Sequence, residues 1–190
     1  PNFFDNDPIL SREGKAVQMH GESSMVTMDA ALEFMRKHAD SPHPFLAVVW
    51  FGSPHRPHKA AEEFRKMYPD QDEKQQNFLG EITGMDYAVG KLRSELREMG
   101  IHEDTVLWYC SDNGGLPEGR TGGRAHKGSI YEGGLRVPAI LEWPGKIAPA
   151  TTDVPCVTSD ILPTVLEIAG ARLPQKRPLD GLSLVPLLQD

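Results

Sequence analysis

The sequence predicts an α/β fold in which a doubly wound, mostly parallel sheet is flanked by helices. Extended and helical patterns alternate along the chain, and the run at 45–51 is apolar throughout, which is typical of a strand covered on both faces. Apolar residues in 73–99 recur at spacings of three and four, which indicates a long amphipathic helix. Ligands of such sheets bind beyond the carboxyl ends of the strands, so the residues that follow the predicted strands form the candidate site.

Length and charge limit the classes of partner. The chain has 190 residues, enough for a single domain over 1–190 with a buried core, in which 1–22 and 171–190 are expected to be peripheral. Its net charge of −7 argues against nucleic acid or an anionic membrane as partner. The cysteines, Cys110 and Cys156, fit neither a metal-ligand spacing nor a disulfide framework, and we expect both to be small buried side chains.

Each predicted element has a local signal. In chain order we expect a helix at about 24–38, a strand at 45–51, a helix at about 73–99, strands at 105–109 and 137–143, and a short helix at 160–169. Ser23 or Ser24 is suited to cap the first helix, and Gly100 to end the second. Pro163 fits only within the first turn of the last helix.

Asp112 and Asn113 follow the predicted strand 105–109 and precede two glycines. Taken alone, Asp-Asn-Gly-Gly is a good turn sequence. A carboxylate and an amide oxygen at the end of a strand are also the hard ligands that a divalent cation prefers. Two such ligands bring one negative charge, so a cation site would need further acids from elsewhere. The neighbouring motifs favour the cation site over the simple turn.

His55 follows the predicted strand 45–51 within a proline-flanked loop. An imidazole at this edge of the sheet can protonate a leaving alkoxide near neutral pH. Arg56 and His58 are expected to be solvated parts of the same loop.

Lys127 lies in a second dense motif, Lys-Gly-Ser-Ile-Tyr-Glu-Gly-Gly. Its glycines allow the backbone to approach another element closely, and an ammonium fixed beside a cation site would stabilise a developing oxyanion. We expect Glu132 and Arg136 to hold this loop by ion pairing. Three cationic side chains precede this motif, Arg120, Arg124 and His126. We interpret them as solvated surface, and a role in recognising further anionic groups of a substrate is the weaker interpretation.

Together these motifs resemble the type I sulfatases, formylglycine-dependent arylsulfatases of the alkaline phosphatase-like superfamily. The resemblance rests on Ser-Asp-Asn-Gly-Gly at 111–115, Pro-His-Arg-Pro-His at 54–58 and the long motif from Lys127 to Ile147, and it continues through 159–170 and 180–188. It covers nearly the whole chain, and the order and spacing of the motifs make chance similarity improbable.

The resemblance implies a sulfuric ester hydrolase that uses one Ca²⁺ ion and a formylglycine nucleophile. Asp112 and Asn113 match calcium ligands of that family, and Lys127 matches the lysine that contacts the sulfate. His55 matches the histidine credited with protonating the leaving group. The implied substrate is a sulfated small molecule or a sulfated carbohydrate, and the implied location is periplasmic or extracellular.

The chain departs from the family at the nucleophile. Neither cysteine is followed by the Pro or Ala and the Arg of the formylglycine motif, and no early strand carries the paired aspartates that complete the calcium site. We therefore expect a partial α/β domain, incomplete at both ends, whose remaining ligands and nucleophile come from a missing N-terminal half and which alone is inactive. The alternatives are a non-catalytic sulfatase-like binding protein and a phosphodiesterase or phosphonate hydrolase of the same superfamily.

Overall fold

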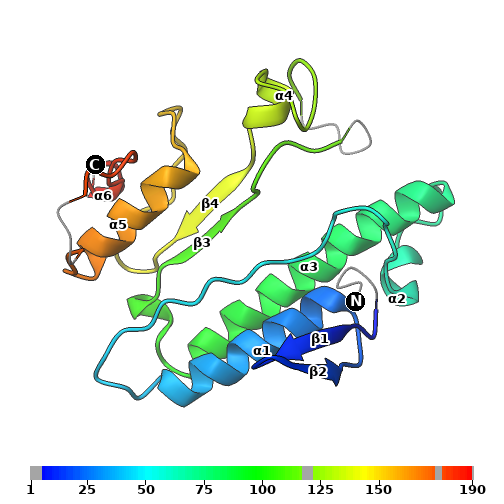
Figure 1. The fold of residues 1–190 in the computed structure, drawn as a ribbon, viewed down its shortest axis with the longest axis horizontal. Coiled ribbons are helices and arrows are strands. Elements are labelled where there is room, and N and C mark those ends of the chain that lie inside the picture. Colours follow the sequence, from blue (N-terminus) through cyan, green and yellow to red (C-terminus); the bar gives the residue numbers. More distant parts are fainter. Residues whose placement is uncertain (1–5, 117–121, 174–176, 190) are drawn as a thin grey trace. The chain divides into compact units, whose positions relative to one another are not determined.

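The computed structural model describes residues 6–116, 122–173 and 177–189, drawn in colour in Figure 1. The chain forms two compact units, Pro1–His102 and Glu103–Asp190. Each is described below by itself. None of the helices in the described parts of the chain has the length and apolar composition needed to cross a membrane.

Two long helices build the N-terminal unit. Helix α1 (Ser23–His38) packs along α3 (Glu73–Glu98), and the short α2 (Glu62–Arg65) also contacts α3. The facing sides of these helices, together with Ala60 before α2, supply the enclosed apolar side chains, which are Val26, Met28, Leu32, Met35, Ala60, Phe64, Met85, Ala88, Leu92 and Leu96. Full burial of one such large side chain stabilises the fold by about 1.5–3 kcal/mol. The predicted helices at 24–38 and 73–99 are therefore confirmed, and Gly100 follows the second helix with a positive φ of 71°.

The predicted serine cap of α1 is wrong. Glu22 is the N-cap residue, and its carboxylate accepts the Met25 N–H at 2.9 Å. The carboxylate also accepts the Ser23 hydroxyl at 3.3 Å. A longer acidic side chain can satisfy the free N–H groups of the first turn as a serine does, and its negative charge suits the positive end of the helix dipole.

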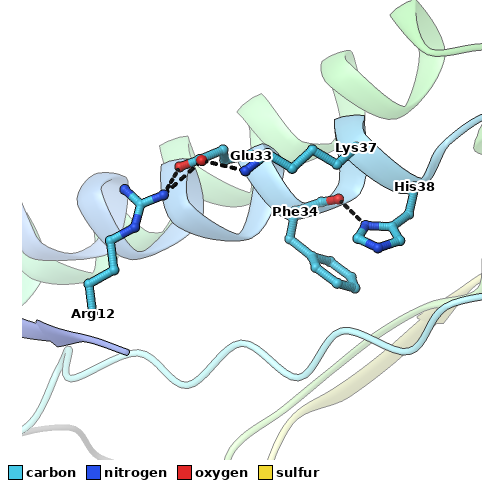
Figure 2. Close-up of polar contacts among 5 residues, drawn as sticks. All are labelled: Arg12, Glu33, Phe34, Lys37 and His38. Atoms are coloured by element: carbon cyan, nitrogen blue, oxygen red, sulfur yellow. Dashed lines mark hydrogen bonds and ion pairs between the residues drawn. The ribbon is translucent and has the colours of Figure 1, made fainter. Parts of the chain in front are cut away.

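A β-hairpin that the sequence analysis did not identify precedes α1. Strand β1 (Ile9–Arg12) pairs antiparallel with β2 (Lys15–Gln18), and Glu13 and Gly14, with φ of 52° and 81°, form the two-residue turn. Figure 2 shows how the hairpin meets α1: Arg12 donates to both carboxylate oxygens of Glu33 at 2.7 Å, and Lys37 donates to the same carboxylate. These hydrogen bonds, from Lys37 and then Arg12, lower the pKa of Glu33.

Residues 45–51 are extended but form no strand. No described residue pairs with their backbone in a ladder, and alternate side chains are open to solvent, with Leu46 at 63%, Val48 at 67% and Trp50 at 86% exposure. Phe45 packs edge-on against Phe34 of α1, with ring centroids 5.7 Å apart. The predicted strand covered on both faces is therefore wrong for the described structure, because a strand requires hydrogen-bonded neighbours.

The C-terminal unit is centred on a second antiparallel pair. After the 3-10 turn η1 (His102–Asp104), strand β3 (Leu107–Cys110) runs beside β4 (Ala139–Glu142), with Cys110 opposite Ala139 (Figure 1). The short helix α4 (Glu132–Leu135) lies between them in the chain. The predicted strands at 105–109 and 137–143 are present as β3 and β4. Both are shorter than expected, and β3 ends one residue later than predicted. Their antiparallel pairing differs from the mostly parallel sheet that was predicted.

The end of this unit is fastened by one buried carboxylate. The 3-10 turn η3 (Thr158–Asp160) leads into α5 (Ile161–Ile168), whose first turn contains Pro163 as predicted, and α6 (Val185–Gln189) packs on α5. Asp160, 6% exposed, accepts the N–H groups of Val157 and Leu182, both at 2.8 Å. Thr164 extends the connection by donating to the Asp160 carbonyl at 2.6 Å and accepting the Leu184 N–H at 2.9 Å.

Candidate functional site

Strand β3 delivers Asp112 and Asn113 into a tight turn. The Ser111 hydroxyl donates to the Asn113 carbonyl at 2.9 Å, which closes the turn directly after the strand. Asp112 is exposed and Asn113 half-buried. Within the described residues no group donates to the Asp112 carboxylate, and the Asn113 carboxamide makes no hydrogen bond. Both side chains therefore have oxygen lone pairs available for a ligand.

Main-chain hydrogen bonds join this turn to the loop that carries Lys127, residues 124–134, which is called the lysine loop below. Gly114 N–H donates to the Gly134 carbonyl, and Lys127 N–H donates to the Gly115 carbonyl, each at 2.9 Å. A Cβ at Gly114 would lie 2.0 Å from the Gly133 carbonyl oxygen, so only glycine permits this approach. The prediction that the glycine-rich motifs bring two backbones into contact is confirmed.

Glycines also fold the lysine loop back on itself. A Cβ at Gly133 would lie 2.1 Å from the Ala125 carbonyl oxygen, and one at Gly134 would lie 2.1 Å from that of Ser129. Gly133 N–H donates to the Arg124 carbonyl at 2.9 Å. Lys127 is half-buried in this loop, and its ammonium has no ion-pair partner among the described residues.

The predicted ion pair between Glu132 and Arg136 is present but weak. The two charged groups are 4.0 Å apart, and both side chains are more than two-thirds exposed, at 72% and 79%. Exposed pairs of this kind contribute about 0–1 kcal/mol. The main-chain hydrogen bonds and the glycine contacts therefore hold the loop, with little help from this pair.

Of the three cationic side chains that precede Lys127, Arg120 lies outside the described residues. The guanidinium carbon of Arg124 lies 3.8 Å from the centroid of the Tyr131 ring. His126 is exposed, and its Nδ1 donates to the Lys127 carbonyl at 3.0 Å. No sequence pattern indicated the contact between Arg124 and Tyr131, because both residues lie in a loop, which has no regular side-chain period.

His55 belongs to the N-terminal unit, in a loop that is tightly closed on itself. Its N–H donates to the Gly52 carbonyl at 3.1 Å, and its ring Nδ1 donates to the Arg56 carbonyl at 2.8 Å. The bonds before Pro54 and Pro57 are both cis. A proton held on Nδ1 by a carbonyl leaves Nε2 as the atom that gives or takes a proton in chemistry.

His58 differs from its prediction as a solvated side chain. It is half-buried, donates from Nε2 to the Pro54 carbonyl at 3.1 Å and packs against Phe78, with ring centroids 5.2 Å apart. A cavity of about 470 Å³ beside this loop is lined by Arg56, Pro57, His58, Lys74 and Asn77. Lys74 and Asn77 come from α3, and no sequence signal placed them beside the loop.

Strand β3 also carries Tyr109 and Cys110, directly before the candidate site. Burial raises the pKa of Tyr109 on β3, with a smaller contribution from Cys110, so this phenol remains neutral. Cys110 is half-buried, as a small core side chain can be, whereas Cys156 is exposed, which corrects the expectation that both are buried.

The structure brings together three of the four predicted site residues by local contacts. Asp112, Asn113 and Lys127 share the backbone junction of the C-terminal unit, whereas His55 lies in the other unit, so its approach to them stays a prediction. Among the described residues, no three His, Cys, Asp or Glu side chains gather as metal ligands. Asp112 and Asn113 would therefore be two ligands of a larger set.

Comparisons with known proteins define the class. The family model described as Sulfatase matches residues 2–171. The chain is 27% identical to the uncharacterized sulfatase YdeN of Escherichia coli over 98% of this chain and 34% of that protein. It is 34% identical to human steryl-sulfatase over 86% of this chain and 29% of that protein. The chain therefore belongs to the sulfatase family, and it spans about a third or less of the length of these relatives.

Solved structures agree with this family. The crystal structure of Ps i-CgsB matches with a TM-score of 0.83 and 29% identity, over 93% of this chain and 40% of that one. The structure of Ps i-CgsB in complex with k-i-k-neocarrahexaose matches with a TM-score of 0.77 and 28% identity, over 92% and 40% of the two chains. A phosphonate monoester hydrolase from Silicibacter pomeroyi, 21% identical with a TM-score of 0.54 over 85% and 40% of the two chains, shares the fold. The described strands thus correspond to part of a larger α/β fold.

Proposed function

We propose that this chain provides the part of a sulfatase active site that holds the cation and the sulfate group of a sulfate ester. The observation that carries the proposal is the pair of main-chain hydrogen bonds, Gly114 to Gly134 and Lys127 to Gly115. They hold the backbone of Lys127 beside the turn that carries Asp112 and Asn113. Membership of the sulfatase family supports hydrolysis of sulfate esters as the reaction class.

The donor set fits a calcium ion. Asp112 and Asn113 offer hard oxygens with no competing partner among the described residues, which is the chemistry that Ca²⁺ prefers. A carboxylate beside an anionic sulfate would otherwise repel it, so a cation between them makes the arrangement favourable. When bound, calcium would neutralise negative charge on the sulfate, and further ligands would come from residues outside this chain.

Lys127 and His55 have separate roles in the proposed reaction. The Lys127 ammonium would contact the sulfate and stabilise the charge that develops on the leaving oxygen. His55, with Nδ1 held by the Arg56 carbonyl, would deliver a proton from Nε2 to that oxygen. The nucleophile would be a formylglycine supplied by a segment absent from these residues, so the isolated chain should not turn over.

Calcium binding tests the cation site directly. Titrating Ca²⁺ into the 190-residue chain should shift the backbone and carboxamide NMR signals of Asp112 and Asn113. Asp112→Asn keeps an oxygen donor but removes the charge, so affinity should fall roughly tenfold or more. The exposed Asp153→Asn is the matched control and should leave binding unchanged. Equal binding by Asp112→Asn and wild type would contradict the proposal.

Turnover tests the expected inactivity. The isolated chain should not hydrolyse 4-nitrocatechol sulfate, whereas addition of a segment that carries the nucleophile should restore hydrolysis that depends on Lys127. Hydrolysis by the isolated chain at ordinary sulfatase rates would disprove the assignment of the nucleophile to another segment.

The alternative function is a sulfatase-like binding protein without catalysis, and it differs from the proposed partial sulfatase in its expected behaviour on heating. Such a protein should melt cooperatively as a monomer. The open extended segment 45–51, with Trp50 at 86% exposure, instead favours a chain that associates through uncovered apolar surface. A thermal melt followed by light scattering distinguishes the two, since scattering should rise during the melt only in the second case.

A further inference from the structure

Arg124 has an exposed guanidinium that stacks on an aromatic ring and that nothing in the proposed reaction uses. Its guanidinium carbon lies 3.8 Å from the Tyr131 ring centroid, the geometry of a cation–π contact. Among the described residues no carboxylate pairs with it, and Glu132 of the same loop lies 4.0 Å from Arg136 instead. The contact with the ring orients the guanidinium without neutralising its charge.

The backbone on both sides of this contact is also fixed. The Arg124 carbonyl accepts the Gly133 N–H at 2.9 Å, and Tyr131 N–H donates to the Ser129 hydroxyl at 3.0 Å. Ala125 has a φ of 66°, in the left-handed region that a residue with a Cβ rarely adopts. Such strain persists only where the surroundings impose it. Arg124 is therefore oriented at its backbone and at its charged end.

A stacked guanidinium still has its N–H donors in the plane of the group. One face is covered by Tyr131, and the edge remains available to a planar or tetrahedral oxyanion in a bidentate arrangement. Lys127 follows three residues later in the same loop and is joined to Gly115 beside the proposed cation site. The loop thus presents a second cationic group a short distance along the chain from Lys127.

We propose that Arg124 is a specificity-determining residue that binds a second anionic group of the substrate, a carboxylate or a further sulfate on a saccharide. The inference rests on the proposed function, in which Lys127 contacts the sulfate that is cleaved. Substrates with one sulfate and no other charge would gain nothing from Arg124, whereas polyanionic saccharides would bind more tightly.

The test uses the ¹⁵N-labelled 190-residue chain with Ca²⁺ and observes the Arg Nε–H signals. Four probes are titrated: inorganic sulfate, a neutral monosulfated disaccharide, a disulfated disaccharide and a monosulfated disaccharide containing a uronic acid. The Arg124 signal should move with the last two probes, and the difference between them identifies the preferred second group. Arg124→Gln should weaken binding of the preferred probe roughly fivefold, the effect of one exposed charge-assisted contact, and leave the neutral probe unchanged.

Two further variants separate recognition from general charge. Arg124→Lys keeps the charge but loses the planar arrangement of N–H donors. Most of the affinity that Arg124 contributes to the preferred probe should therefore be lost. Arg136→Gln removes an exposed charge from the same loop and should leave all four probes unaffected. An equal loss for Arg136→Gln and Arg124→Gln would overturn the inference.

Failure of this inference is distinguishable from failure of the proposed function. If Lys127 and Asn113 respond to the sulfated probes while Arg124→Gln binds all of them as wild type does, Arg124 has no role in recognition and the sulfate site stands. If no signal of Asp112, Asn113 or Lys127 responds to any probe, the sulfate site itself is wrong, and the inference is overturned with it.

Discussion

At the scale of single residues, the site depends on positions that have no side chain. Gly114, Gly133 and Gly134 each lie where an added Cβ would come within 2.0–2.1 Å of a carbonyl oxygen of a neighbouring segment. Side chains such as Asp112 and Lys127 bring the chemistry, but these backbone contacts decide which side chains become neighbours. The most informative single substitutions are therefore at glycine.

Gly114→Ala should open the junction. The added methyl group would collide with the Gly133 carbonyl, and overpacking of this kind costs about 1–3 kcal/mol. The Lys127 amide, which donates to Gly115, should then exchange with solvent faster, as measured by hydrogen exchange with NMR detection. Calcium affinity should fall with it.

Gly90→Ala provides the control for that experiment. An added Cβ at Gly90 meets no atom within 4 Å, and the position lies inside α3, where alanine stabilises a helix by roughly 0.5–1 kcal/mol relative to glycine. Exchange at Lys127 should be unchanged in this variant. If Gly114→Ala protects the Lys127 amide as well as wild type does, the junction does not depend on the glycine.

At the scale of elements, the helices followed from the sequence and the strands followed only in part. The apolar residues of α1 and α3 recur with a helical period, three or four residues apart. A helix can therefore be predicted from residues that are close together in the sequence. Strand pairing depends on partners distant in the chain. The apolar run at 45–51 could therefore not show whether another strand would pair with it. The hairpin β1–β2 was missed because its strands have four residues each, too few for a clear alternation.

Asp160, at the N-terminal end of α5, holds Val157 and Leu182 through its carboxylate, and this clamp depends on pH. Hydrogen bonds from the N–H groups of Val157 and then Leu182 lower the pKa of Asp160 below the ordinary value of an aspartate. Because the folded-state pKa is the lower one, the stabilisation is complete above the unfolded value and is lost as pH falls through the folded value. The amides of Leu182 and Leu184 should therefore lose exchange protection at acidic pH.

Asp160→Asn tests the same clamp at neutral pH. The carboxamide retains one acceptor oxygen, so one of the two N–H groups loses its partner, and α6 should detach from α5 more readily. Hydrogen exchange at Leu182 and Leu184 reports the change, and the exposed Asp153→Asn is the control. Protection that is independent of pH and unaffected by Asp160→Asn would show that other contacts hold α6.

At the scale of the whole molecule, the two units are stabilised differently. Every fully enclosed apolar side chain among the described residues lies in the N-terminal unit, between Val26 and Leu96. The C-terminal unit is held by main-chain hydrogen bonds, close glycine contacts and the hydrogen bonds of Asp160 and Thr164. Burial of apolar surface is the larger stabilising contribution, so the two units should differ in their resistance to unfolding.

Hydrogen–deuterium exchange in increasing denaturant should reveal two transitions. Peptides from β3, β4 and the lysine loop should exchange first, and peptides from α1 and α3 should stay protected to higher denaturant concentration. Added Ca²⁺ should shift the first transition upward and leave the second in place, because ligand binding stabilises only the unit that binds. A single transition shared by all peptides would contradict this division.

Part of the candidate site followed from the sequence. Asp112 and Asn113 were proposed as oxygen donors at the end of a strand, and Lys127 as an ammonium in a glycine-rich loop. The close backbone approach that the glycines indicated is present, whereas the roles of the three side chains stay predictions. The contact between Arg124 and Tyr131 was not predicted, since a loop has no period that relates one side chain to another. The same limit applies to His55, whose partners across the chain are set by tertiary structure.

The junction at Gly114 has a consequence for how such proteins diversify. Because main-chain hydrogen bonds join the two motifs, exposed side chains beside them, such as those of Arg124 and His126, can be exchanged without disturbing the junction that positions Lys127. New preferences for the remainder of a substrate can then arise by substitution at such exposed positions, while the architecture underneath is inherited unaltered.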